Sequence, residues 1–283
     1  MAVPILKKES LIPGTTSKMV LYAPEIARHA KPGHFVILRV NEHGERIPLT
    51  IADADAEKGE ITIVYLVLGK TTSLLESLKE GDSLLDVCGP LGKATRIEKK
   101  GCVVCVGGGT GIAAMHHIAK GHHKAGNKVV AIIGARNKDL LLFEKELSLF
   151  ADELLISTDD GSYGHKGFVT DLLKEKLDTD KSIFEVVAVG PVPMMAAVSK
   201  LTLPYKVHTT VSLNPIMVDG IGMCGACRVT VGGKTCFACV DGPEFDGHQV
   251  DFNELRLRLN AFREQEKKSL EAYKSKNGSA NNG

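Results

Sequence analysis

The chain has 283 residues, 43% of them hydrophobic, 29 glycines and a formal net charge of +1, which predicts two modest globular domains. Its basic and acidic residues are evenly interspersed, so no basic stripe indicates a nucleic-acid partner. The N-terminus lacks a signal-peptide core and no apolar run reaches membrane-spanning length, which with free cysteines predicts a cytoplasmic protein without a membrane partner.

Residues 1–98 are predicted to form a small antiparallel β-barrel. Short runs of β-branched and apolar residues alternate there with glycine, proline or charged turns. The expected strands cover residues 19–26, 34–40, 48–53, 61–68 and 83–89.

Arg46 and Thr50 flank Pro48 at the start of one of these strands. A guanidinium there can bind a pyrophosphate, and a hydroxyl can donate to the edge of a flavin ring. The alternative is a surface arginine at the beginning of a strand. The residues alone leave both interpretations open.

From Gly101 onward, buried strands alternate with amphipathic helices, which predicts a parallel α/β sheet. The expected strands are 102–108, 128–135, 153–160, 184–190 and 206–212, and the expected helices are 112–126, 142–151, 168–177 and 193–201.

Two glycine-rich turns follow strands of this predicted sheet. Glycines between a strand and a helix let a pyrophosphate approach the backbone amides at a helix N-terminus. One such turn has a plain alternative, a tight connection that needs glycine. Two on the carboxyl edge of one sheet favour a dinucleotide. The first turn contains Gly107, Gly108, Gly109 and Gly111, and the second Gly190, Pro191, Pro193 and Met194.

Histidines and isolated cysteines are expected to have no cofactor role. The pattern HHxxxxHH on one helix predicts solvent-exposed side chains rather than a metal site. Cysteines within or beside apolar runs predict buried thiols. The histidines are His116, His117, His122 and His123, and the cysteines are Cys88, Cys102 and Cys105.

The other four cysteines lie in one glycine-rich segment near the end of the folded part. They form two CxxC pairs separated by eight residues, which is typical of a zinc knuckle. With Asp219, three of them also match the spacing of plant-type 2Fe-2S ferredoxins, aspartate replacing the first cysteine. Glycines that turn amides toward bridging sulfides favour this second set. The zinc set is Cys224, Cys227, Cys236 and Cys239, and the iron-sulfur set is Asp219, Cys224, Cys227 and Cys239.

The order of the motifs RIPLT, GPLG, GGGTGIAA, GPVPMM and a cysteine segment ending in CVDGP resembles the ferredoxin-reductase-like family. Within it, the chain is similar to electron-transfer subunits of dihydroorotate dehydrogenases. It is more similar to small (alpha) subunits of NADH-dependent ferredoxin–NADP oxidoreductases, also called sulfide dehydrogenase small subunits. The dihydroorotate type has four cysteines, so Asp219 resembles the second type.

The resemblance implies a fold and a division of the chain. An antiparallel FAD-binding barrel is expected over residues 1–98 and a parallel-sheet NAD-binding domain over 99–213. A segment that binds a 2Fe-2S cluster is expected over 214–250, and a C-terminal helix with a disordered tail over 251–283. The amphipathic pattern at Leu255, Leu257, Leu259 and Phe262 leaves open whether that helix packs on this chain or on a partner.

The resemblance also implies binding residues, with no catalytic side chain in the narrow sense. Thr71 departs from the family motif, which has glycine there. FAD is expected at Arg46, Pro48, Leu49, Thr50, Tyr65, Leu66, Thr71 and Thr72. NAD(H) is expected at Gly107, Gly108, Gly109, Thr110, Gly111, Asp159, Asp160, Gly190, Pro191 and Met194. The implied cluster ligands are Asp219, Cys224, Cys227 and Cys239, without Cys236.

The implied activity is electron transfer from NADH to FAD and through a 2Fe-2S cluster to a larger subunit. That subunit has its own flavin and 4Fe-4S clusters, and the heterodimer uses ferredoxin and NADP(H) in electron bifurcation. The dihydroorotate dehydrogenase type is the first alternative. A non-enzymatic, zinc-containing nucleotide-binding protein is the alternative from another class.

Overall fold

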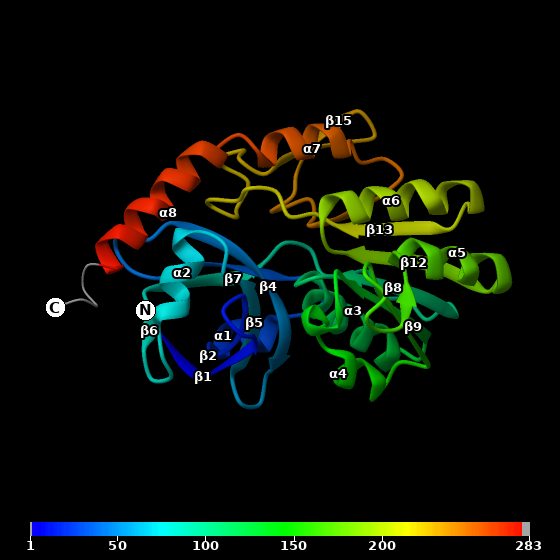
Figure 1. The fold of residues 1–283 in the computed structure, drawn as a ribbon, viewed down its shortest axis with the longest axis horizontal. Helices are drawn as coiled ribbons and strands as arrows, with labels where there is room; N and C mark the ends of the chain where they lie inside the picture. Colours follow the sequence, from blue (N-terminus) through cyan, green and yellow to red (C-terminus); the bar gives the residue numbers. More distant parts are fainter. Residues whose placement is uncertain (1, 279–283) are drawn as a thin grey trace.

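Two sheets lie side by side along the long axis of the molecule, and the C-terminal segments run across both (Figure 1). The computed structural model describes residues 2–278. Within that range, an antiparallel barrel is followed by a mainly parallel sheet with helices on both faces. The predicted order of a barrel and an α/β sheet is therefore confirmed.

The barrel has the strand order β6-β1-β2-β5-β4-β3-β7. Its edge strands β6 and β7 are separated in sequence only by Leu85, whose N–H donates to the carbonyl of Val40 at 3.2 Å. Because consecutive residues form both edges, the sheet curls back on itself and is nearly closed. Its elements are β1 (Val3–Ile12), β2 (Thr16–Tyr22), α1 (Pro24–His29), β3 (Phe35–Arg39), β4 (Arg46–Asp55), β5 (Glu60–Leu66), α2 (Lys70–Ser77), β6 (Ser83–Leu84) and β7 (Asp86–Leu91).

Three details of the barrel differ from the prediction. The strand expected over 19–26 ends at Tyr22, because Pro24 opens helix α1, where its fixed φ suits the first turn. Strand β1 and helix α2 were not predicted, since charged residues on the exposed face of β1 obscure its alternation. Cys88 is exposed on β7 rather than buried, whereas Cys102 and Cys105 are buried as expected.

The second sheet has the order β11-β10-β9-β8-β12-β13-β16. Side chains of β8 alternate between its faces: Val104 and Val106 pack with helices α5 and α6, and Val103 and Cys105 with α3 and α4. Its elements are β8 (Cys102–Gly108), α3 (Gly111–Lys124), β9 (Lys128–Ala135), η1 (Lys138–Leu140), α4 (Glu144–Ser148), β10 (Glu153–Thr158), β11 (His165–Lys166), α5 (Val169–Thr179), β12 (Ile183–Val189), α6 (Val192–Thr202), η2 (Leu203–Tyr205) and β13 (His208–Ser212).

The histidines of helix α3 are not solvent-exposed, so that prediction is wrong for three of the four. His116, His117 and His122 are 7%, 8% and 0% exposed, and only His123 lies at the surface. The barrel packs against the face of α3 that a free helix would show to water, and His117 Nδ1 lies 2.9 Å from the Ile51 carbonyl oxygen. Burial lowers the pKa of His116 and of His122 to about 4, so both are neutral at neutral pH.

The C-terminal part forms a hairpin, one edge strand and two helices. Gly232 and Gly233, with φ of +57° and +73°, form the turn between its antiparallel strands. Strand β16 pairs antiparallel with β13 and extends the α/β sheet. No helix within residues 2–278 is long and apolar enough to cross a membrane. The elements are β14 (Arg228–Val231), β15 (Lys234–Phe237), β16 (Glu244–Asp246), α7 (Phe252–Leu259) and α8 (Arg263–Gly278).

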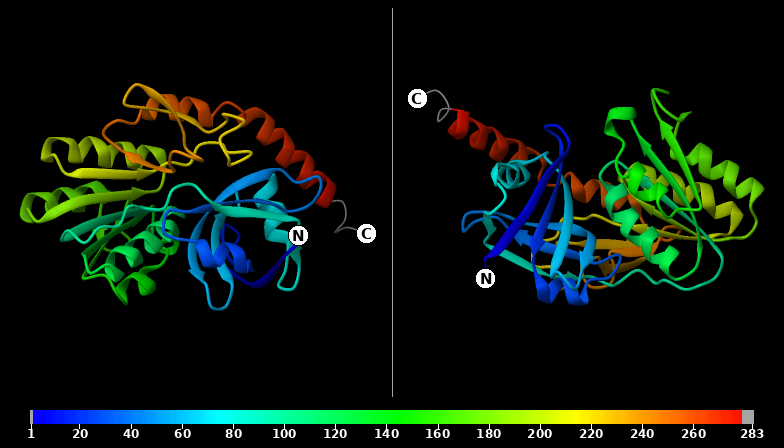
Figure 2. Two further views of the ribbon diagram at one scale, coloured as in Figure 1. Left: turned by 180° about the vertical axis from the view of Figure 1, so that it is seen from behind. Right: turned by 90° about the horizontal axis from the view of Figure 1, so that it is seen from below.

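Two helices stand where one was predicted. Leu255 of α7 is buried in this chain's own core, whereas Leu257 and Phe262 are 70% and 53% exposed. Helix α8 then crosses to helix α2 of the barrel (Figure 2). The tail predicted to be disordered from residue 275 is helical to Gly278, and 279–283 lie outside the described residues.

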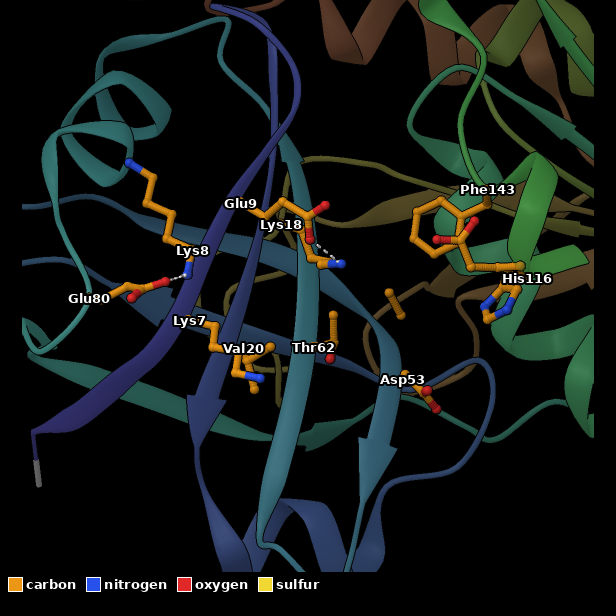
Figure 3. A pocket seen from close by; sticks show the side chains of 12 residues that line it. Lys7, Lys8, Glu9, Lys18, Val20, Asp53, Thr62, Glu80, His116 and Phe143 are labelled. Carbon is orange, nitrogen blue, oxygen red and sulfur yellow. Dashed lines mark hydrogen bonds and ion pairs between the residues drawn. The ribbon is translucent and has the colours of Figure 1, made fainter.

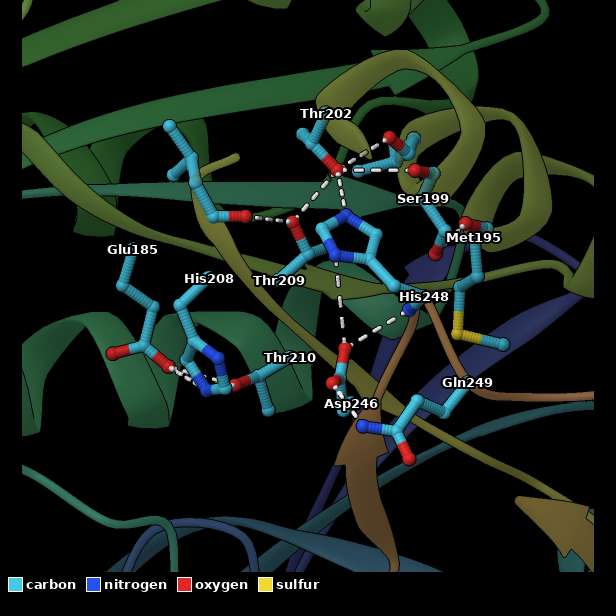
Figure 4. A network of polar contacts seen from close by, with 12 residues as sticks. Glu185, Met195, Ser199, Thr202, His208, Thr209, Thr210, Asp246, His248 and Gln249 are labelled. Carbon is cyan, nitrogen blue, oxygen red and sulfur yellow. Dashed lines mark hydrogen bonds and ion pairs between the residues drawn. The ribbon is translucent and has the colours of Figure 1, made fainter. Parts of the chain in front are cut away.

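A polar network fastens the β16 segment to the α/β sheet (Figure 4). The Thr209 hydroxyl donates to the Thr202 oxygen at 2.7 Å, and that oxygen lies 2.8 Å from His248 Nε2. On β13, the Thr210 hydroxyl donates to Glu185 at 2.7 Å. Such networks specify one register, because each buried polar group needs its partner. The cysteine segment is thus fixed to the α/β sheet.

Glu244 on β16 is a titratable part of this junction. Its Oε1 accepts a hydrogen bond from the Thr95 hydroxyl at 2.7 Å. Burial, with a smaller contribution from Glu185, raises the pKa of Glu244 from 4.5 to about 7. Between these values the folded protein holds a proton that the unfolded chain has released, so stability falls as the pH rises through this window.

We therefore expect Glu244→Gln to reduce the loss of stability between pH 5 and pH 8, since glutamine still accepts from Thr95 but does not ionise. Thermal unfolding of the purified protein across this pH series measures the effect. Glu175→Gln, at an exposed position of α5, is the matched control. A Glu244→Gln protein with the pH slope of the wild type would contradict the expectation.

Candidate cofactor sites

The cysteine loop contains one preformed pair of sulfurs. The Sγ atoms of Cys227 and Cys239 lie 3.2 Å apart, and the Cys239 N–H points at the Cys227 sulfur at 3.5 Å. Both residues are buried, and burial followed by the contact with Cys227 raises the pKa of Cys239 to about 12. Two adjacent buried thiols ionise together only beside a cation, because two thiolates repel each other. This pair therefore suits a metal centre.

Asp219 and Cys224 lie on the outer half of the same loop. The Asp219 carboxylate accepts from the N–H groups of Ile221 at 2.9 Å and Cys224 at 2.5 Å. These bonds, that to Ile221 first, lower the pKa of Asp219, so it is ionised. A carboxylate has about four lone pairs and can accept these bonds and still coordinate a metal. Within residues 2–278, no three acidic, cysteine or histidine side chains already form a metal-binding group, so Cys227 and Cys239 are the preformed half.

Glycines allow the loop to wrap closely. Gly220, Gly222 and Gly225 have φ of +76°, +83° and +64°, values that other residues rarely adopt. A side chain at Gly220 would lie 2.7 Å from Ile37 and from Leu91 of the barrel. The loop therefore contacts the barrel next to strand β4, because Ile37 pairs with Pro48.

Cys236 lies apart from this pair in the hairpin. It stands on β15 opposite Val229 of β14 and packs with the apolar residues around the loop. Among the hydrogen bonds of the described chain, none joins its sulfur to another cysteine. The geometry thus gives the zinc set no preformed contact through Cys236.

The start of β4 and the start of α2 meet at the predicted FAD residues. Arg46 is exposed at the first position of β4. Next to it in sequence, Glu45 accepts a hydrogen bond from the Thr71 hydroxyl at 2.7 Å. The Thr72 hydroxyl accepts from Gly69 N at 3.0 Å and so caps α2. The backbone N–H groups at the start of a helix and the exposed guanidinium of Arg46 both suit an anion.

The other residues expected to bind FAD differ in how far their side chains are exposed. Tyr65 is 1% exposed, and its hydroxyl donates to Glu76 at 2.8 Å, so its side chain belongs to the barrel core. Leu66 is 41% exposed beside it. Pro48, Leu49 and Thr50 are partly buried along β4. The structure thus leaves Tyr65 only its backbone for a ligand.

The two glycine-rich turns meet at one edge of the parallel sheet. Strands β8 and β12 are neighbours, with Gly107 opposite Val189. A side chain at Gly111 would lie 2.7 Å from the Cα of Gly190, so the turns are in contact. Met194 lies against Gly108. This close backbone approach at the N-terminus of α3 is the geometry that accepts a pyrophosphate.

Asp159 and Asp160 follow β10, two strands away from β8 on the same edge. Both are exposed, and the hydrogen bonds from Ser162 lower the pKa of Asp160. Asp160 N donates to the Arg136 carbonyl at 3.2 Å, which holds this turn beside β9. The edge from β10 to β12 therefore presents acidic groups at one end and glycine turns at the other.

A crevice of about 530 Å³ separates the outer face of the barrel from helices α3 and α4 (Figure 3). Phe143 and His116 form one wall, and the barrel strands form the other. Lys18 pairs there with Glu9 at 2.5 Å. None of the residues predicted to bind a cofactor is among its lining residues. Sequence reasoning missed it, because its walls come from different domains.

Two family models match the chain. The model of the iron-sulfur cluster binding domain of dihydroorotate dehydrogenase B matches residues 214–251, and that of the oxidoreductase NAD-binding domain matches residues 105–200. The first describes the cysteine loop, and the second the sheet edge with the glycine turns.

Individual relatives agree with these models. A dihydroorotate dehydrogenase B (NAD(+)) electron transfer subunit homolog of Thermotoga maritima is 51% identical, over 89% of each chain. The dihydroorotate dehydrogenase B (NAD(+)) electron transfer subunit of Fusobacterium nucleatum is 34% identical, over 83% of this chain and 93% of the relative. A solved structure of NADH-dependent reduced ferredoxin–NADP oxidoreductase, studied for flavin-based electron bifurcation, is 47% identical with a TM-score of 0.90. It matches over 96% of this chain and 98% of its own.

Proposed function

The chain belongs to the dihydroorotate dehydrogenase B electron-transfer subunit family, and on that premise we propose that it transfers electrons between NADH and a larger partner subunit. Its cofactors in this role are FAD and a 2Fe-2S cluster, as the iron-sulfur and NAD-binding models and the flavin-based relative support. Electron transfer from FAD to the cluster requires the two to lie close together. The observation that best supports it is that the cysteine loop packs against β3, the strand paired with the proposed FAD strand β4.

The chain's own residues bind and orient these groups. Arg46 and the N-terminus of α2 hold the FAD pyrophosphate, and the glycine turns hold that of NADH. Asp219, Cys224, Cys227 and Cys239 hold the cluster. When bound, the groups supply two-electron reduction of flavin by nicotinamide and one-electron transfer through the cluster. The protein aligns them and excludes water, and no side chain has to move a proton.

We assign the partner as a larger flavin and 4Fe-4S subunit that uses ferredoxin and NADP(H), with the heterodimer in the cytoplasm. The 47% identity to the ferredoxin–NADP oxidoreductase chain and the aspartate at position 219 favour this type. The second candidate, an electron-transfer subunit of dihydroorotate dehydrogenase, is favoured by the description of the cluster-domain model. Co-purification of the partner from cells distinguishes the two.

The absorption spectrum of the purified chain tests the cofactors. Flavin bands together with iron-sulfur absorption are expected, and anaerobic NADH should bleach the flavin. A colourless protein that contains zinc would contradict the proposal and favour the non-enzymatic alternative.

NADH should reduce the flavin roughly tenfold faster than NADPH does at equal low concentrations. We place the adenosine ribose beside the exposed Asp159 and Asp160, where a carboxylate accepts from a 2′-hydroxyl and repels a 2′-phosphate by about 1.4 kcal/mol. Stopped-flow measurement of flavin bleaching compares the two. Asp159→Ser should narrow the ratio. Equal or faster reduction by NADPH would count against this assignment.

A further inference from the structure

Two arginines hold the short turn between the first two cysteines of the loop. The carbonyl oxygen of Gly225 accepts from Arg228 Nη1 at 2.9 Å, and that of Ala226 accepts from Arg258 Nη2 at 3.1 Å. Gly225 and Ala226 are the residues between Cys224 and Cys227. Both peptide carbonyls of the CxxC turn are therefore tied to cations.

These contacts fix the direction of the amides. In a trans peptide the C=O and N–H groups point in opposite directions. With its carbonyl turned toward Arg228, the peptide between Gly225 and Ala226 directs the Ala226 N–H at the Cys224 sulfur, at 3.5 Å. The Arg258 contact orients the next peptide, whose N–H belongs to Cys227.

Arg258 comes from outside the segment that the cluster-domain model matches. That match ends at residue 251, and helix α7 begins at Phe252. Asp251 caps α7 by accepting from two backbone N–H groups, and its own N–H donates to Thr230 on β14 at 2.9 Å. Leu255 is 1% exposed. Arg258 follows Leu255 by one turn on the same face, so the helix aims its guanidinium at the cysteine loop.

Arg258 has no acidic partner in the described part of the chain. Among the ion pairs of residues 2–278, none includes Arg228 or Arg258. The Nε atom of Arg258 is buried without a hydrogen bond, in an apolar crevice of about 340 Å³ that Ile216 and Phe262 also line. A partly buried guanidinium without a counter-charge lowers the stability of the folded protein. This cost points to a negatively charged group, absent from the chain itself, with which Arg258 interacts.

We propose that Arg258, with Arg228, positions the CxxC turn and raises the reduction potential of the cluster. The inference rests on the proposed cluster site. An electron added to a cluster makes it more negative, so a nearby cation favours the reduced form, and water screens the partly buried Arg258 less than the exposed Arg228. The Ala226 N–H, which the Arg228 contact turns toward the Cys224 sulfur, acts in the same direction. Arg258 is a positioning residue, and its effect is electrostatic as well as structural.

The midpoint potential of the cluster, followed by EPR during a redox titration of the whole chain, tests this. Arg258→Gln is expected to lower the reduced-to-oxidised ratio at a fixed potential roughly tenfold, which is about 59 mV for one electron. Arg256→Gln is the matched control, since Arg256 lies on the same helix but is exposed. It should change the ratio by less than about twofold, as expected for a screened surface charge. Arg258→Lys keeps the charge and should recover most of the shift.

A merely structural arginine would lower cluster occupancy without moving the potential of the clusters that remain. If Arg258→Gln and Arg256→Gln shift the potential equally, the inference is overturned while the proposed function stands. A wild-type protein without a 2Fe-2S signal would instead overturn the proposed function itself. If Arg258→Gln retains no cluster, Arg228→Gln is titrated in its place. Arg228 is exposed, so its effect comes from the Gly225 carbonyl that it holds, and a potential no different from that of Arg256→Gln overturns the inference.

Discussion

Cys227→Ser is expected to abolish the iron-sulfur absorption of the purified protein, whereas Cys236→Ser leaves it intact. The Cys227 sulfur lies 3.2 Å from that of Cys239 in the buried half of the loop, while Cys236 stands on the hairpin. A serine oxygen is a harder and weaker ligand for iron than a thiolate. Both variants replace a cysteine by serine, at positions 9 residues apart in one segment. A difference between them therefore reports whether the cysteine binds the cluster. Iron and sulfide content, with the visible spectrum, measures occupancy.

The same prediction extends to Asp219, the one proposed ligand that is not a thiolate. Asp219→Ala should make the cluster labile, because it removes a ligand and the two amide contacts that shape the loop. Asp219→Cys should keep a 2Fe-2S cluster with a lower potential, since a thiolate donates more charge to ferric iron than a carboxylate does. An intact cluster in Asp219→Ala, or cluster loss in Cys236→Ser, would move the fourth ligand to Cys236.

Arg46→Ala should release FAD from the protein on desalting while the iron content stays unchanged. A charge-assisted contact to the pyrophosphate contributes about 1.5–3 kcal/mol, so its loss weakens binding roughly ten- to a hundredfold. Arg46 is exposed at the start of β4, and none of the ion pairs of the described residues includes it, so it is free to bind an anion. Flavin released into the filtrate, measured by fluorescence, gives the occupancy.

Arg28→Ala provides the comparison for Arg46→Ala. Arg28 is 58% exposed on α1 and pairs only with Glu25 of the same helix, so its removal deletes a similar surface charge away from β4. It should retain flavin as the wild type does. Full flavin occupancy of Arg46→Ala after extensive dialysis would exclude Arg46 from the site and restore its interpretation as a surface residue.

Features that depend on local sequence pattern could be predicted before the fold was known. Alternating apolar residues marked most strands, and the glycines after β8 and β12 marked two turns at one sheet edge. The carboxyl ends of parallel strands lie at the same edge of a sheet. The sequence was therefore enough to place the two glycine turns together. The spacing of cysteines limited the metal site to two ligand sets, but both contain Cys224, Cys227 and Cys239, and local spacing could not choose between Asp219 and Cys236.

Features that depend on contacts between distant parts of the chain could be recognised only in the folded molecule. The histidine pattern on α3 matches an exposed helix face, yet the barrel contacts that face at His117, His116 packs against Phe143, and His122 Nδ1 lies 3.2 Å from Asn127 Nδ2. Closure of the barrel depends on the position of β6 and β7 at opposite edges, which no single strand pattern encodes. Arg258 is 31 residues beyond Cys227 and reaches the CxxC turn because Leu255 docks α7 on the core. Helix α7 packs on the core because this buries its apolar face. That packing brings the Arg258 guanidinium to the proposed cluster site, where its charge acts.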